Sequence, residues 1–146
     1  MLEIFKGALP TLEIYEKYEK LAQEKNCGAC CVFCGVVRKE NDISGLSFDI
    51  YEPLLKKWFI NWSKKLEQEK IFLAMAHSVG DVLVLQSSFM CALISPQRKA
   101  ALKYYDEFVE DFKHHAPIWK YDLKNSERIY AKERSFLLPE SGLFAK

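Results

Sequence analysis

The sequence has little of what marks a secreted, membrane or nucleic-acid-binding protein. Lysine and arginine together number 21 and aspartate and glutamate 20, so no excess charge draws the chain to nucleic acid or to an anionic membrane. No apolar run approaches the roughly 20 residues that a membrane-spanning helix needs, and the first residues lack the basic start and apolar stretch of a signal peptide. We therefore expect a cytoplasmic protein whose anion sites, if it has any, are local.

Flexible and repetitive segments are also scarce. The 146 residues include six glycines and five prolines, and no linker rich in Gly, Pro or Ser, internal repeat or low-complexity stretch divides them. Apolar residues make up 49% of the chain and aromatic residues 14%, which is enough for a sizeable core. The composition predicts one domain over residues 1–146.

The cysteines do not follow the spacing of a typical metal site. Cys27, Cys30, Cys31 and Cys34 lie close together at the start of an apolar segment over residues 29–37, which reads as a buried strand. A strand that rises about 3.3 Å per residue would separate the outer two by roughly 23 Å and place the middle two on opposite faces. We interpret them as small buried side chains, with metal binding and redox chemistry as less favoured alternatives and disulfides disfavoured by the compartment.

Hydrophobic periodicity predicts three helices separated by short strands. The first helix has Thr11 as its cap and ends near residues 26–28, the second has Pro53 in its first turn, and the third covers about residues 96–113. The polar segment 38–45 is expected to be an exposed loop. Strands are predicted over residues 29–37, 46–50, 71–78, 82–86, 88–94, 118–123 and 127–132. This order predicts an α+β fold, with helices packed on a mostly antiparallel sheet.

Two lysines flank a rigid apolar segment at the point where the third helix must end. Pro117 disfavours a helical conformation for the residue before it, so the helix should stop near His115 and the chain should continue extended. Lys113 would then lie on the last helical turn and Lys120 on the next strand, from which both ammonium groups can reach one ligand. The alternative is that both are ordinary solvated lysines.

Further cations lie where other predicted elements begin or end. Arg38 ends the first apolar strand, where a surface ion pair is the alternative to a functional role. Gln97 and Arg98 lie where a strand passes into the third helix, whose N-terminus offers free N–H groups and the positive end of the helix dipole. A local site for a phosphorylated substrate fits these cations and the lysine pair better than a nucleic-acid surface does.

The three histidines give a weaker signal. His114 and His115 are adjacent, so on a helix they point about 100° apart and do not easily share a metal ion. His77 lies within a predicted strand, and we interpret it as a structural histidine rather than a catalytic one.

Six short motifs follow one another along the chain in a fixed order. They are Gly28-Ala29, Phe33-x-Gly35-x-Val37-Arg38, Leu46-x-Phe48-Asp49-x-Tyr51, His77-x-Val79-Gly80, Ser95-x-x-Arg98-x-Ala100 and Lys113-x-x-Ala116-Pro117-Ile118-Trp119-Lys120. Together they resemble the MoaE family, the large catalytic subunits of molybdopterin synthase, over about residues 28–134. The resemblance implies an α/β-hammerhead fold and a homodimer. It also implies a small ubiquitin-like partner at each end of that dimer, which makes a heterotetramer.

The resemblance also implies a reaction. A partner with a C-terminal Gly-Gly thiocarboxylate would give its sulfur, twice, to cyclic pyranopterin monophosphate (precursor Z) to form molybdopterin, without a metal or an organic cofactor. Lys113 would act at the thiocarboxylate carbon or in proton transfer, and Lys120 would assist at the same centre. The residues implied to bind the phosphorylated pterin or line its pocket are Arg38, Arg98, Gln97, Arg134, Phe33 and Val109.

The chain departs from the family pattern at a few positions. Gln97 stands where the family usually has histidine, so an imidazole proton shuttle is lost there, although glutamine still forms hydrogen bonds. Ser78 also stands where arginine is commoner in the family, and Tyr130 where tryptophan is.

Two other functions remain open: an adaptor whose lysines only hold the carboxylate of a ubiquitin-like protein, and a nucleotide- or phosphate-binding regulator.

Overall fold

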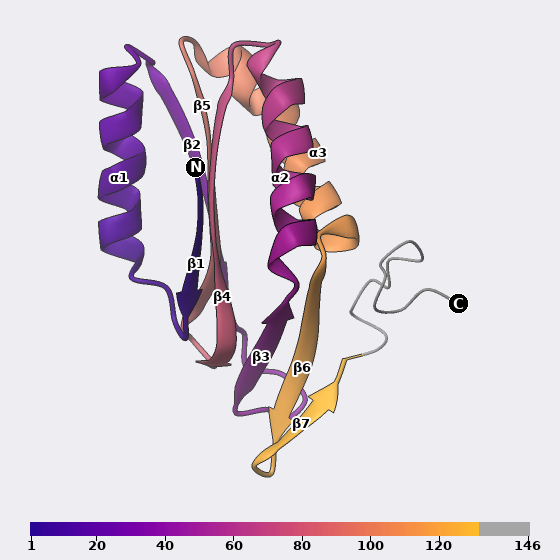
Figure 1. Cartoon of the computed structure of the whole chain (residues 1–146). Helices are drawn as coiled ribbons and strands as arrows, with labels where there is room; N and C mark the ends of the chain where they lie inside the picture. The colour runs from indigo at the N-terminus through magenta and orange to yellow at the C-terminus, as the bar shows by residue number, and fades with distance from the viewer. Residues whose placement is uncertain (132–146) are drawn as a thin grey trace.

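Helices cover both faces of a seven-stranded sheet. The computed structural model describes residues 1–131, in which α1 lies on one face of the sheet and α2 and α3 lie on the other (Figure 1). The elements are β1 (Leu2–Lys6), α1 (Thr11–Glu24), β2 (Ala29–Val36), β3 (Gly45–Ile50), α2 (Glu52–Glu67), β4 (Phe72–Leu83), β5 (Ser87–Ser95), α3 (Arg98–His115), β6 (Ile118–Lys124) and β7 (Glu127–Tyr130). The predicted α+β class is confirmed. None of the described helices is long and apolar enough to cross a membrane.

Strand β4 connects the two parts of the sheet, whose order is β2-β5-β4-β3-β6-β7 with β1 also paired to β4. The sequence predicted two strands here, separated at Gly80. Instead β4 runs unbroken, pairing with β5 in its first half and with β3 in its second. Gly80 takes a positive φ of 81° at the change of partner, a conformation that glycine adopts without strain. The sequence analysis also missed β1, which pairs in parallel with β4.

Strand β2 was predicted to be buried but lies at one end of the strand order, where it is only partly covered. Most of its side chains are only half-buried, and Cys34 and Val36 are exposed. Cys30 packs with the apolar cluster under α1 and Cys31 with the cluster under α2 and α3. The prediction that these two cysteines face opposite sides is therefore confirmed, and the five cysteines are unpaired.

The helix ends follow local sequence signals closely, with one exception. Pro10, not Thr11, occupies the cap position of α1, and no side chain caps this helix. Pro53 lies in the first turn of α2, as predicted. Helix α3 ends at His115, and Ala116 is extended with a ψ of 135°, as a residue before proline should be.

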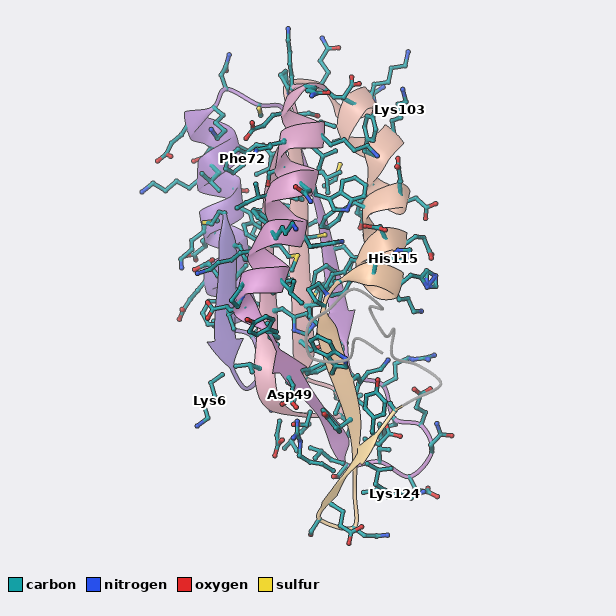
Figure 2. The ribbon with its side chains drawn as sticks, turned by 45° about the vertical axis from the view of Figure 1, so that its right-hand side comes forward. Lys6, Asp49, Phe72, Lys103, His115 and Lys124 are labelled. Carbon is teal, nitrogen blue, oxygen red and sulfur yellow. The ribbon has the colours of Figure 1, made fainter. Side chains whose placement is uncertain are left out.

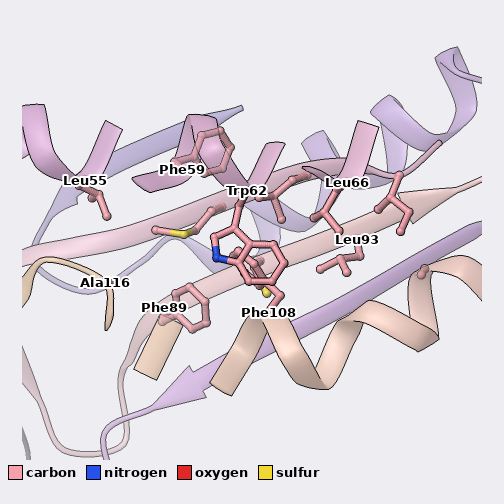
Figure 3. Close-up of a cluster of buried hydrophobic side chains, with 13 residues drawn as sticks. Leu55, Phe59, Trp62, Leu66, Phe89, Leu93, Phe108 and Ala116 are labelled. Carbon is pink, nitrogen blue, oxygen red and sulfur yellow. The ribbon is translucent and has the colours of Figure 1, made fainter. Parts of the chain in front are cut away.

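The larger of the apolar clusters lies between the sheet and the pair α2 and α3 (Figure 3). Helix α2 buries residues spaced three or four apart, which is the period of one helix face: Leu55, Phe59, Trp62 and Leu66. In strand β3 the polar Ser47 is buried, and its hydroxyl donates a hydrogen bond to Asp81 at 2.6 Å.

A carboxylate in α3 ties the two helices of this face together. The indole N–H groups of Trp58 and Trp62 both donate to Oδ2 of Asp111, at 3.1 and 2.6 Å. Its Oδ1 lies 2.7 Å from Nδ1 of His115, one turn further along α3. The last turns of α3 are therefore held against α2 by hydrogen bonds to a charged group, which are stronger than neutral ones.

We predict that Asp111→Ala lowers the free energy of unfolding by about 2–3 kcal/mol, because it leaves two partly buried indole donors without their acceptor. Urea unfolding measures the loss. Asp106→Ala, an exposed position on the same helix, is the matched control and should change stability by less than about 0.5 kcal/mol. Equal losses in the two variants would contradict the role of the Asp111 carboxylate.

Candidate functional site

A pocket of about 280 Å³ lies where the last turns of α3 meet strands of both parts of the sheet. Helix α3, strands β2 to β6 and the segment after β2 all contribute to its lining. Among the lining residues are five that the sequence analysis selected: Phe33, Arg38, Val109, Lys113 and Lys120. Side chains separated by up to 87 positions in the sequence thus meet in one place.

The two lysines reach the pocket from different elements. Lys113 is exposed on the last turn of α3, where a cation is also favoured by the negative end of the helix dipole. Lys120 is half-buried on β6, and its Cα is paired with that of Phe48 on β3. Because paired residues of neighbouring strands direct their side chains to the same face, Lys120 and Phe48 line the same pocket. The turn at Pro117 brings the two elements together.

Arg38 is the third cation of the pocket, and a neighbouring carboxylate already contacts it. Its guanidinium lies 3.1 Å from Oε2 of Glu40, which lines the same pocket. The Arg38 side chain is 80% exposed, so this ion pair contributes little to stability. An anionic ligand would compete with Glu40 for the planar guanidinium, which can bind phosphate or carboxylate through two hydrogen bonds.

Aromatic rings form the apolar part of the lining. Phe89 and Phe112 stack with their centroids 3.8 Å apart and their planes 6° from parallel. The ring of Phe33 lies 5.8 Å from that of Phe89, and Val109 lines the same pocket. Such a surface can take up a flat ring and exclude water, and electrostatic interactions are stronger where water is excluded.

His77, on β4, also lines this pocket, although the sequence analysis interpreted it as structural. The side chain is buried, and its Nδ1 lies 2.7 Å from the carbonyl oxygen of Ser78. Burial lowers the pKa of His77 to about 4, against the weaker opposing effect of that hydrogen bond. The imidazole is therefore neutral at physiological pH.

Gln97 and Arg98 lie outside this pocket. Both are exposed at the start of α3 and line a separate cavity of about 560 Å³ beside Gly28. The 15 residues from Arg98 to Lys113 span roughly 22 Å of helix, and Figure 2 shows Lys103 and His115 toward opposite ends of α3. The predicted cluster of four cations is thus not formed within one chain, because Arg98 lies in the first turn of α3 and Lys113 in its last turn. Arg134 lies outside the described residues.

Cationic and aromatic side chains dominate the lining of the pocket. Within residues 1–131, no three His, Cys, Asp or Glu side chains gather closely enough to hold a metal ion. The three cations and the aromatic rings of the pocket suit an anion next to a flat ring.

Comparison with known proteins identifies the family. The family model described as "MoaE protein" matches residues 10–115. The chain belongs to the MoaE family. It is 58% identical to the molybdopterin synthase catalytic subunit of Helicobacter pylori strain ATCC 700392 / 26695, a match that covers 99% of this chain and 100% of that protein. The corresponding subunit of strain J99 is 52% identical, with the same coverage.

Solved structures agree with this assignment to the MoaE family. A complex of subunits 1 and 2 of molybdopterin-converting factor from Helicobacter pylori 26695 contains a chain that superposes with a TM-score of 0.92 at 58% identity, covering 99% of both chains. Molybdopterin synthase from Staphylococcus aureus, at 22% identity and a TM-score of 0.75 over 88% of this chain and 94% of that one, shares the fold. The predicted family is confirmed, as is the prediction of an enzyme, the catalytic subunit of a molybdopterin synthase.

Burial of His77 in this MoaE chain predicts a pH-dependent stability. The folded-state pKa of about 4 lies below the ordinary value of 6.5, so the unfolded chain binds the extra proton between these values. Stability is therefore full above about pH 6.5 and falls as the pH drops toward 4, by up to about 3 kcal/mol from this residue. Unfolding curves for the wild type and His77→Gln at several pH values measure the difference. His114→Gln, at an exposed position, should keep the wild-type pH dependence, and the same slope in His77→Gln would contradict the assignment.

Proposed function

We propose that this MoaE-family subunit transfers sulfur from the C-terminal thiocarboxylate of a small ubiquitin-like partner to cyclic pyranopterin monophosphate, twice, in molybdenum cofactor biosynthesis. The observation that carries the proposal is the convergence of Lys113, Lys120 and Arg38 on one aromatic-lined pocket. The names of the Helicobacter pylori relatives support the enzyme and the pathway. Our proposal adds the identity of the sulfur donor and of the sulfur acceptor.

The pocket suits the proposed substrate in both of its parts. The cyclic phosphate is an anion, for which Arg38 offers a planar guanidinium and the lysines offer point charges. The pterin is a flat, polar ring system that can lie against the aromatic side chains of Phe33, Phe89 and Phe112. A pocket that offers cations next to an aromatic surface fits this substrate, which has a phosphate and a planar ring, better than it fits a bare anion.

The cations also address the main electrostatic obstacle of the reaction. A thiocarboxylate and a cyclic phosphate are both anions, so bringing them together in a water-poor pocket is unfavourable unless positive charge is already in place. In our proposal the thiocarboxylate sulfur bonds to a substrate carbon and displaces the oxygen substituent of that carbon, which leaves with a proton or as the phosphate oxygen. Water then adds to the acyl carbon and the acyl C–S bond breaks with its electron pair on sulfur, so that a thiolate stays on the substrate and a carboxylate on the partner. Lys113 stabilises the oxyanion that develops at the acyl carbon and exchanges protons there, and Lys120 assists.

The partner would approach over apolar surface beside the pocket. Val36, Leu83 and Leu85 are exposed by 50, 52 and 66%, and the amide of Leu85 donates to the carbonyl of Val37 at 2.6 Å, which joins the turn after β4 to the end of β2. Val36 also lines the pocket. A narrow Gly-Gly tail could pass from such a patch to the lysines. The Helicobacter pylori neighbour is a complex of two subunits, which supports a small partner for this chain.

The cytoplasmic location expected from the sequence remains a prediction.

We predict that Lys113→Ala lowers sulfur transfer by about 100-fold or more, because a group acting on the transition state is lost. The assay mixes the protein with a thiocarboxylated partner and cyclic pyranopterin monophosphate and measures the gain of two sulfurs by mass spectrometry. Lys103→Ala, exposed on the same helix but outside the pocket, is the control and should keep full activity.

The same variant separates an enzyme from an adaptor. If the lysines only hold the carboxylate of the partner, Lys113→Ala should abolish complex formation. If they act in catalysis, the complex should largely persist while turnover collapses. Retained turnover in Lys113→Ala would overturn the catalytic assignment. A nucleotide-binding regulator would instead be stabilised against heat by common nucleotides without any partner.

Roles for Gln97 and Arg98 in the same site require a second copy of the chain. Their cavity lies at the other end of α3 from the lysines, so one chain cannot supply both sets of residues to one ligand. We therefore propose that the active form is a homodimer, or a heterotetramer with two partner subunits, in which these residues face the pocket of the other copy.

Subunit mixing tests this arrangement. Lys113→Ala and Arg98→Ala should each be inactive alone, but equal mixtures that exchange subunits should recover about a quarter of the wild-type activity, because half of the dimers are mixed and each of these has one intact site. If both residues served one site within the same chain, every site in the mixture would keep a defect. No recovery after subunit exchange, verified by native mass spectrometry, would contradict the shared site.

A further inference from the structure

A neutral histidine lies among the cations of the pocket. The three cations can only donate hydrogen bonds, and Glu40, which accepts, is already paired with Arg38. His77 lines the same pocket, and no step of the proposed sulfur transfer uses it. Its side chain is buried, so each of its ring nitrogens needs a hydrogen-bond partner, either in the protein or in a ligand.

The contacts of His77 fix which of its nitrogens carries the proton. Nδ1 lies 2.7 Å from the carbonyl oxygen of Ser78. A carbonyl oxygen only accepts, so the proton of the neutral ring is on Nδ1 and the lone pair is on Nε2. Burial holds the pKa near 4, which excludes the doubly protonated form at physiological pH.

Three aromatic rings from three elements hold the imidazole in place. Phe48 on β3 lies edge-to-face with it at 4.9 Å, Phe89 on β5 lies at 5.9 Å and Phe112 on α3 at 5.6 Å. Two of these rings also stack on each other. The imidazole is therefore pre-oriented before any ligand arrives, and a pre-oriented group loses little entropy when it forms a hydrogen bond.

We infer that His77 is a specificity-determining residue whose Nε2 accepts a hydrogen bond from an N–H group of the bound pterin. This inference rests on the proposed function for its substrate. The cations recognise the charge of the phosphate, which any phosphorylated compound shares, whereas a fixed neutral acceptor requires a donor at a defined place on the ring. A site built to bond such a donor discriminates against ligands that lack it.

Two amide substitutions separate the two nitrogens of His77. His77→Asn keeps a donor near the position of Nδ1, so the bond to Ser78 can persist, but it removes the acceptor at Nε2. His77→Gln can place its amide oxygen near Nε2 and gives up the Nδ1 bond. Calorimetric binding of cyclic pyranopterin monophosphate, without the partner, measures each effect apart from turnover.

We expect His77→Asn to weaken pterin binding about tenfold or more, which corresponds to the loss of one hydrogen bond. His77→Gln should restore binding to within about threefold of the wild type, and the affinity of both variants for inorganic phosphate should be unchanged. Unchanged pterin binding in His77→Asn, or equal losses in both variants, would overturn the inference and leave His77 a structural residue.

Kinetics then distinguish a contact with substrate from a contact with a lysine. If Nε2 bonds the pterin, His77→Asn raises KM while kcat at saturation and its pH dependence stay near those of the wild type. A displaced basic limb of the pH–rate profile would mean that His77 acts on Lys113 or Lys120, and it would also overturn the inference.

A measurement on the wild-type protein avoids the risk that a variant fails to fold. In protein labelled with ¹⁵N-histidine, the unprotonated Nε2 of His77 should change its resonance on addition of the pterin, while the exposed His114 and His115 serve as internal references. No change at saturating pterin would contradict the inference. Pterin binding that perturbs His77 without sulfur transfer in the complete assay would instead count against the proposed function alone.

Discussion

The chain reversal at Ala116 and Pro117 is the constraint on which the site depends. It ends α3 after His115 and starts β6 at Ile118, so Lys113 and Lys120 leave different elements and still line one pocket. The backbone of Ala116 is extended because the ring of the next proline disfavours the helical conformation. Hydrogen bonds from α2 to the Asp111 carboxylate hold this end of α3 against the neighbouring helix. The position of Lys113 is therefore set in part by hydrogen bonds to a residue two positions before it.

Aromatic packing links this end of α3 to the sheet. Phe112 stacks on Phe89 of β5 and lies beside His77 of β4, so the residue before Lys113 is fixed to the two longest strands. Helix α3, the sheet and the histidine thus form one rigid unit, with the cations around its edge. Because the backbone of this unit is already in place, binding of a ligand has only the lysine side chains to order.

Local signals in the sequence were enough to predict the class of fold and most helix and strand positions. The end of the helix between Lys113 and Lys120 could be predicted because Pro117 constrains the residue before it, which is a purely local effect. The continuity of β4 could not be predicted, since Gly80 is as typical of a turn as of a strand that changes partner, and only the pairing with β3 and β5 decides between them. The separation of Arg98 and Lys113, by contrast, already follows from the single helix predicted over about residues 96–113, so the predicted cluster of cations was inconsistent with that helix. The pocket position of His77 follows from strand register rather than from its neighbours in sequence.

The near balance of charge gives the pocket its particular character. With a net charge of +1 over the whole chain, the protein has no long-range field to concentrate anions, and exposed charges farther apart than about 8 Å are largely screened at physiological ionic strength. The three cations around the pocket can therefore act only on a ligand already inside it. Selection among the many phosphorylated compounds of a cell must then come from short-range contacts, namely a flat aromatic surface and a fixed neutral acceptor. This is why the uncharged lining of the pocket matters as much as its lysines.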